Sequence, residues 1–167
     1  MPLPPADYLD YRNQSRSFES MAAAELWSPS LTGVDRAEQL RGLHASASLF
    51  DVLGVKPAIG RTFTAADDAP GAPNAVVLSH RIWTRNFGGD PAVLGRSILL
   101  NGVSYTVIGV MSEGFHFPPF WANRAEIYAT PAYRAALAND RRMSTLRVFA
   151  RLKPGVSLEQ AQARSAR

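Results

Sequence analysis

The chain has 167 residues, 46% of them hydrophobic and 19% charged, which excludes a disordered segment and allows one ordinary domain or two small lobes sharing a core. It contains no cysteine, which excludes disulfide bonds, thiolate chemistry and cysteine-ligated zinc. The formal net charge of +4 comes from residues 134–167, where basic side chains are dispersed among apolar positions. This distribution favours a solvated surface over a nucleic-acid-binding face.

The sequence shows no targeting or membrane-spanning pattern. Met1 to Pro5 have neither the basic region nor the apolar stretch of a signal peptide. No apolar run approaches the roughly 18–20 residues that span a bilayer. We therefore expect the chain as written to be soluble.

The first third of the chain predicts two helices and a pair of strands. Prolines at the first turn and helical spacing predict a helix over Pro5–Ser15. Residues 18–27, followed by Ser-Pro-Ser, favour a strand, and Glu38–Ala47 alternates well enough to form a second strand paired with it. Residues 48–54 predict a short helix that ends at Gly54.

The composition of the chain changes at Lys56, which indicates a lobe boundary there. Proline and glycine make residues 57–73 a loop around one helical turn. Residues 75–78 predict a short buried strand, and Ser79 caps a helix that Gly88 ends. Asp90 and Pro91 then start one further turn.

The clearest local signal is a β-hairpin over Arg96–Leu100 and Val103–Val110, because Asn101-Gly102 suits a two-residue type I′ turn. An aromatic, proline-rich loop follows at Gly114–Trp121. Glu126–Thr130 is a further strand candidate.

The C-terminal part predicts one strand and one helix. Residues 145–152 alternate as in a strand. Ser157 and Gln160 have the spacing of a capping box, so a helix begins at Leu158. It reaches Arg167 without a stop signal, and we expect the chain to be cut within a helix.

No pattern in the sequence predicts catalysis. His44, His80 and His116 form no spaced ligand pair, and we expect structural roles for them. Asp67 and Asp68 are adjacent, which favours solvated or capping roles over a paired-carboxylate site. Phosphate-binding glycine loops and a nucleophile elbow are missing as well, so we expect no catalytic residue, no cofactor, no metal and no binding or hydrolysis of ATP.

The aromatic loop is the one unusual feature. Its aromatic side chains either fill the core, which is the favoured interpretation, or form an exposed apolar surface that binds a partner. If they are exposed, they are the candidates for partner docking: Phe115, Phe117, Phe120 and Trp121.

Taken in order, several strings of the sequence resemble the periplasmic core domain of MacB-like ABC-transporter permeases, which have FtsX-like membrane segments. The strings are distributed along almost the whole chain: Arg16–Met21, Leu49–Pro57, Gly60–Phe63, Val76–His80, Phe87–Pro91, Asn101–Met111, Phe115–Pro118 and Arg151–Ala161.

The resemblance implies an α+β fold of two lobes. Residues 1–56 and 132–167 would form a porter-like lobe of β-α-β units around an inserted, mainly β lobe of residues 57–131, in agreement with the change at Lys56. The flanking membrane helices, and the strand that relatives place before the first helix, are not in this sequence. We therefore expect a segment of a longer protein.

The resemblance also implies a function. The domain would face the periplasm at the bacterial inner membrane, between two membrane helices, and couple ATP-driven movement of those helices to substrate export or to partner docking. Its partners would be its own membrane helices and a separate ATPase, with a periplasmic adaptor or a substrate protein as further candidates and no nucleic acid. The isolated domain would be monomeric. A small extracytoplasmic enzyme and a basic nucleic-acid-binding module are the alternatives.

Overall fold

The computed structural model describes residues 8, 10, 12, 13, 16–69, 71–116, 124–130 and 147–165. Its strands are β1 (Phe18–Trp27), β2 (Ser30–Thr32), β3 (Glu38–Gln39), β4 (Gly42–Ala45), β5 (Pro57–Gly60), β6 (Ala75–Leu78), β7 (Ser97–Leu100), β8 (Val103–Met111), β9 (Ile127–Ala129) and β10 (Arg147–Leu152). Its helices are α2 (Leu49–Leu53), α3 (His80–Phe87) and α4 (Leu158–Ser165), with single 3-10 turns η1 (Ala65–Asp68) and η2 (Pro91–Val93). The predicted α+β class is confirmed.

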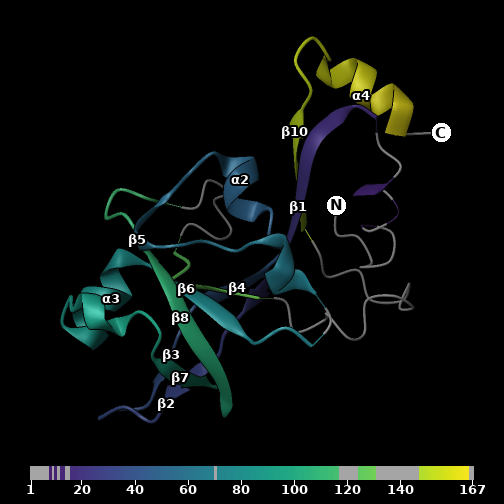
Figure 1. Ribbon diagram of the computed structural model, residues 1–167. Helices are drawn as coiled ribbons and strands as arrows, with labels where there is room; N and C mark the ends of the chain where they lie inside the picture. The colour runs from purple at the N-terminus through teal and green to yellow at the C-terminus, as the bar shows by residue number, and fades with distance from the viewer. Residues whose placement is uncertain are drawn as a thin grey trace.

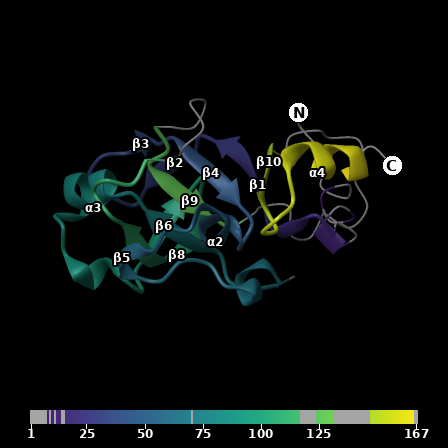
Figure 2. The ribbon, with the colours of Figure 1, turned by 90° about the horizontal axis from the view of Figure 1, so that it is seen from above.

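All of these strands belong to one mixed sheet, in the order β10-β1-β4-β9-β6-β8-β7-β2-β3, with β5 paired to β8. The β4–β9 and β6–β8 pairs are parallel, and the other pairs are antiparallel. In Figures 1 and 2, β1, β10 and α4 occupy one end of the molecule, and α3 lies at the other.

The long strand β1 connects β10, at one end of the molecule, with the rest of the sheet. Its first residues pair with β10, from Phe18 opposite Leu152 to Ala24 opposite Arg147, and its last residues pair with β4. The predicted strand at 18–27 is therefore confirmed, and the one at 145–152 is confirmed over its described residues, 147–152. Instead of one strand over 38–47 there are two short ones: β4 pairs with β1 as predicted, whereas β3 pairs with β2. Because β4 in turn pairs with β9, the sheet is continuous, and the division into lobes at 1–56, 57–131 and 132–167 stays a prediction.

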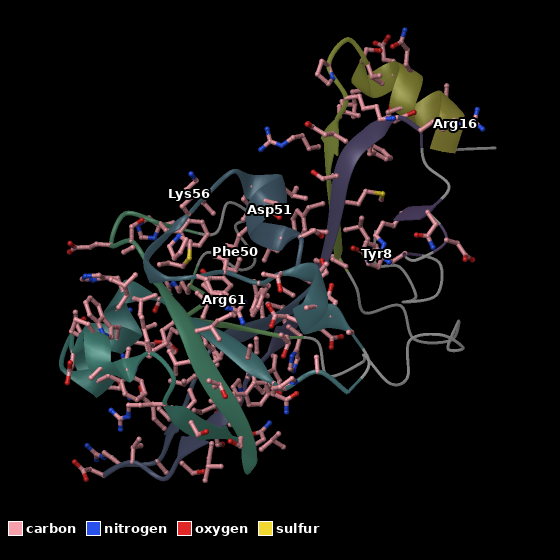
Figure 3. The ribbon with its side chains drawn as sticks, in the orientation of Figure 1. Tyr8, Arg16, Phe50, Asp51, Lys56 and Arg61 are labelled. Atoms are coloured by element: carbon pink, nitrogen blue, oxygen red, sulfur yellow. The ribbon has the colours of Figure 1, made fainter. Side chains whose placement is uncertain are left out.

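Both faces of β1 are covered by apolar side chains. Ala22 and Ala24 belong to a buried cluster that contains Phe50 of α2, and Ala23 belongs to a second cluster with Tyr8. Tyr8 and Phe50 accordingly lie on opposite sides of β1 (Figure 3). Alanine suits this position because its small side chain lets a helix and an aromatic ring approach the strand closely.

The local signals in the middle of the chain are confirmed. Ser79 Oγ accepts a hydrogen bond from Ile82 N at the start of α3, and Gly88 ends that helix with a φ of 65°. Asn101 and Gly102 have φ angles of 52° and 75°, as a type I′ turn between β7 and β8 requires. The short helix α2, the turn η1, the turn η2 and the strand β9 also lie where the sequence predicts them.

Two strands form where the sequence predicts loop, at β2 and β5. Leu31 of β2 is fully buried in an apolar cluster and lies opposite Leu100 of β7, so its burial outweighs the turn residues around it. At the end of β5 the chain approaches β8 so closely that a Cβ atom at Gly109 would lie only 2.1 Å from the carbonyl oxygen of Arg61, the residue after β5. Sequence patterns do not report such contacts between distant residues.

Part of the predicted structure lies outside the described residues. Of the helix predicted over Pro5–Ser15, the structure describes Tyr8, Asp10, Arg12 and Asn13, which are helical. Most of the aromatic loop, residues 117–121, lies outside. The helix α4 begins at Leu158, and the predicted capping box is present: Gln160 N donates to Ser157 Oγ at 3.2 Å and Ser157 N donates to Gln160 Oε1 at 3.1 Å.

Candidate functional site

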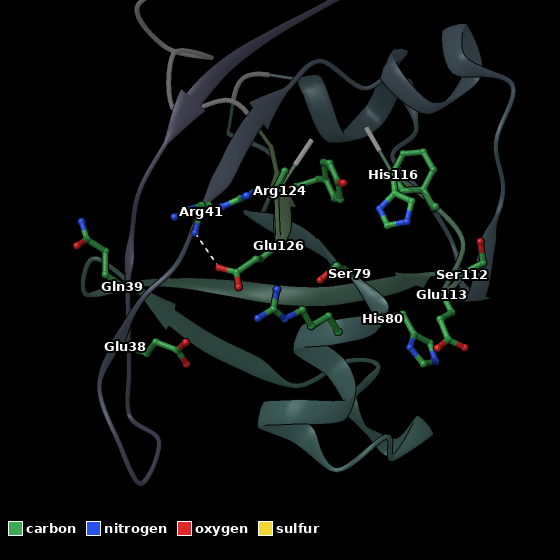
Figure 4. A pocket seen from close by; sticks show the side chains of 14 residues that line it. Glu38, Gln39, Arg41, Ser79, His80, Ser112, Glu113, His116, Arg124 and Glu126 are labelled. Carbon is green, nitrogen blue, oxygen red and sulfur yellow. Dashed lines mark hydrogen bonds between the residues drawn. The ribbon is translucent and has the colours of Figure 1, made fainter. Parts of the chain in front are cut away.

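A polar groove of about 730 Å³ lies at one edge of the sheet (Figure 4). The parallel strands β6 and β8 both end at this edge. Because β9 is antiparallel to β6 and parallel to β4, the strands β9 and β4 both begin there. Polar residues just beyond these four strand ends therefore converge, as side chains do at the carboxyl ends of parallel strands in α/β proteins.

Glu126 connects the strand ends at the groove through hydrogen bonds of its backbone and its side chain. Its backbone N–H donates to the Arg41 carbonyl oxygen at 2.7 Å, and its carbonyl oxygen accepts from Ser79 N at 2.8 Å. Its side chain, only 15% exposed, accepts from Arg41 N through Oε2 at 3.0 Å. One residue thus ties the beginnings of β4 and β9 to the end of β6.

The helix α3 neutralises two of the carboxylates that line the groove. Arg85 forms an ion pair with Glu38, and its Nη2 also lies 3.5 Å from Glu126 Oε1. Asn86 Nδ2 donates to the second oxygen of Glu38 at 3.1 Å. The acidic side chains on this wall are therefore already hydrogen-bonded or paired.

Other charged groups of the groove are uncommitted. Arg41, Arg81 and Arg124 all line it and are exposed. Within the described residues, none of their guanidinium groups forms a hydrogen bond or an ion pair, and neither does the carboxylate of Glu113. The uncommitted groups thus carry three positive charges and one negative charge.

One wall of the groove is aromatic. The half-buried ring of Phe115 packs against Phe50 and Tyr128, with centroids 6.2 Å and 5.9 Å apart. Burial raises the pKa of the Tyr128 phenol far above its usual range. Of the four docking candidates, Phe115 therefore contacts the core, while Phe117, Phe120 and Trp121 lie outside the described residues. Their docking role stays a prediction.

The histidines differ in position. His44 is buried, its Nδ1 lies 2.9 Å from the carbonyl oxygen of Thr130, and its ring packs on Trp27 with centroids 4.0 Å apart. These contacts agree with the structural role expected from the sequence. His80 and His116, which the sequence does not connect, both line the groove. In the described part of the chain, no three His, Asp or Glu side chains are grouped to hold a metal ion.

Asp67 is buried and Asp68 is partly buried, and the carboxylates of both are hydrogen-bonded. Asp67 completes a capping box with Thr64 and pairs with Arg61 Nη1 at 2.8 Å, which confirms the predicted capping role. Burial alone would raise the pKa of Asp67, but the hydrogen bonds from Arg61 and Thr64 outweigh it and hold the pKa below its usual value. Asp68 Oδ2 accepts from Ala47 N at 2.9 Å.

Comparison with solved structures defines the fold as that of extracytoplasmic domains of transporter permeases. The periplasmic region of MacB from Actinobacillus actinomycetemcomitans matches with a TM-score of 0.71 and 18% identity, over 98% of this chain and 72% of that one. A domain of a putative permease protein from Porphyromonas gingivalis matches with a TM-score of 0.71 and 19% identity, over 98% and 74%. The extracellular domain of the noncanonic ABC-type transporter YknZ from Gram-positive bacteria matches with a TM-score of 0.69 and 18% identity, over 94% and 75%.

The chain matches the MacB-like periplasmic core domain over residues 1–167, and it belongs to that family. The resemblance inferred from the sequence is thereby confirmed: this is a periplasmic domain of a MacB-like ABC-transporter permease, with an extracytoplasmic location and an ATPase as partner. Among curated proteins, none matches the chain. No helix in the described ranges is both long and apolar enough to cross a membrane.

Proposed function

We propose that this domain is a non-catalytic coupling element at the periplasmic face of the inner membrane. It transmits ATP-driven movement of the permease's membrane helices to substrate export or to a docked partner protein. The observation that carries this proposal is the continuity of β1, which is hydrogen-bonded to β10 at one end and to β4 at the other.

A strand of this kind is suited to transmit a displacement. Its ten residues span about 33 Å. The central residues Ala22, Ala23 and Ala24 are fully buried, with packed clusters on both faces. Because closely packed interiors deform little, a pull on the β1–β10 pair moves the rest of the sheet instead of bending the strand.

The docking part of the proposal assigns partner contacts to the aromatic segment. Phe115, Phe117, Phe120 and Trp121 lie close together in sequence around two prolines, which limits the entropy lost on binding. Phe115 is fixed at one end of this segment by its contacts with Phe50 and Tyr128. An adaptor or a substrate protein is the proposed occupant, and the isolated domain is proposed to be monomeric.

The coupling role is tested first by the coding sequence around this segment, which must supply four membrane helices and an ATPase within the same chain or beside it. The docking role is tested by replacing Phe120 and Trp121 with alanine in the complete permease. We expect weaker transport or partner capture, while the melting temperature of the domain stays within about 2 °C of wild type.

Phe115→Ala is the matched control, because it removes a ring packed against the core. It should lower the melting temperature by several degrees. If the Phe120 and Trp121 double variant loses as many degrees as Phe115→Ala, these side chains belong to the core and the docking proposal is wrong.

A further inference from the structure

The groove at the ends of β6 and β8 has the size and the charges of a ligand site. Its volume of about 730 Å³ falls within the range of small-molecule pockets, about 300–1,000 Å³. The carboxylates that line it on one side, those of Glu38 and Glu126, already have a cationic partner, because Arg85 pairs with Glu38 and lies within ion-pair distance of Glu126. A cationic ligand would have to displace that arginine.

The arginines that line the groove have no such partner among the described residues. Arg41 precedes β4 and Arg124 precedes β9, and the register that places Gly42 opposite Ile127 keeps these two strand beginnings adjacent. Both residues lie on the same side of the groove in Figure 4, beside Glu126. Their guanidinium groups form no hydrogen bond or ion pair with the described residues, so their donors are available to a ligand.

Arginine donors in a fork geometry match the oxygens of carboxylates and phosphates. The position of Arg41 is also fixed without its side chain, because its backbone N–H donates to Glu126 Oε2 and its carbonyl oxygen accepts from Glu126 N. The Phe115 ring supplies an apolar surface in the same groove. The site is thus suited to a ligand that carries an anionic group next to an apolar one.

We propose that this groove binds an oxyanion, a carboxylate or a phosphate group, held by Arg41 and Arg124, with the apolar part of the ligand against Phe115. The site is distinct from the coupling role of the domain, and it can be tested on the 167-residue chain alone.

The experiment is an NMR titration with three probes. The first is the peptide acetyl-Gly-Gly-Phe with a free carboxylate, the second is the same peptide as its C-terminal amide, and the third is inorganic phosphate. We expect the free peptide or phosphate to shift the backbone amide signals of Arg41, Ser79 and Ser112, and the amidated peptide to bind at least about tenfold more weakly than the free one. Binding by the peptide or by phosphate alone identifies the source of the oxyanion.

Arg41→Gln and Arg124→Gln should each weaken binding by about tenfold. Arg16→Gln is the matched control, because Arg16 is exposed beside α4, outside the groove (Figure 3). It should change affinity by less than about twofold. Unchanged melting temperatures for all three variants show that the effects come from lost contacts and not from unfolding.

Three results would overturn the proposal. The first is that neither the free peptide nor phosphate shifts the groove signals at about 10 mM. The second is that the peptide and its amide bind equally well. The third is that Arg16→Gln weakens binding as much as the two groove variants do.

Discussion

Replacing Glu126 by alanine is expected to destabilise the domain by about 2 kcal/mol. The variant removes the carboxylate that accepts from Arg41 N at 3.0 Å, and such a bond contributes about 1.5–3 kcal/mol where the acceptor is charged. The ion pair with Arg85, whose side chain is 38% exposed, contributes less than about 1 kcal/mol because solvent screens it. The backbone hydrogen bonds of Glu126 to Arg41 and Ser79 remain.

Urea denaturation measures this loss, and two control variants separate its causes. Glu126→Gln keeps an oxygen for the Arg41 N–H and loses only the charge, so it should cost about 1 kcal/mol or less. Glu113→Ala removes a groove carboxylate that forms no hydrogen bond with the described residues, so it should stay within about 0.5 kcal/mol of wild type. If Glu126→Ala is as stable as Glu113→Ala, the side chain does not hold the strand beginnings together and the reasoning fails.

Two further predictions concern the β5–β8 contact and the turn beside it. Gly109→Ala should lower the free energy of unfolding, measured by urea denaturation, by more than about 3 kcal/mol, because its Cβ would lie 2.1 Å from the Arg61 carbonyl oxygen. Gly114→Ala is the control: it has open space around it and should lower the free energy of unfolding by less than about 0.5 kcal/mol. Similar losses in the two variants would contradict the close approach of β5. Because the folded-state pKa of Asp67 is lowered, its stabilisation is present above the unfolded value of about 3.9 and is lost as the pH falls through the folded value. Asp67→Asn should therefore flatten the fall in unfolding free energy on acidification below about pH 5, and an unchanged slope in a pH series of denaturation curves would argue against this assignment.

The elements that the sequence predicts well are those specified by adjacent residues. Asn101-Gly102 requires positive φ at both positions, and few structures other than a tight hairpin supply it. Ser79 and Gly88 define both ends of α3 within ten residues, and Ser157 with Gln160 defines the start of α4. In each case the stabilising contact lies within the motif, so the prediction does not depend on the rest of the fold.

The elements that the sequence misses depend on distant contacts. The strand β5 begins at Pro57 and ends at Gly60, both of which ordinarily favour a loop, and it forms because Gly109 of β8 leaves room for it. The parallel β4–β9 and β6–β8 pairs likewise leave no local trace, because their partners are more than 25 residues apart.

The groove follows from those same pairs, which is why no single motif predicts it. Its charged residues come from the segments 38–41, 79–81, 112–116 and 124–126, each of which is ordinary when taken alone. The available signal is positional: polar residues immediately follow the predicted strand at 75–78, they begin at Ser112 after the strand predicted at 103–110, and they immediately precede Ile127. If the first two strands are parallel neighbours, these residues must meet at one edge.

This origin also separates the chemistry of the groove from the stability of the fold. Arg41 and Arg124 lie outside the strands and direct exposed side chains to solvent, whereas the adjoining strand residues Leu43 and Ile127 are fully buried. Substitutions at the two arginines therefore leave the apolar core intact, because the transfer free energy that stabilises the sheet resides in the buried side chains. Glu126 is the exception, since its carboxylate belongs both to the groove and to the hydrogen bonds that join the strands. A variant set that contrasts Glu126 with Arg124 thus distinguishes a residue that builds the site from one that is available to bind its ligand.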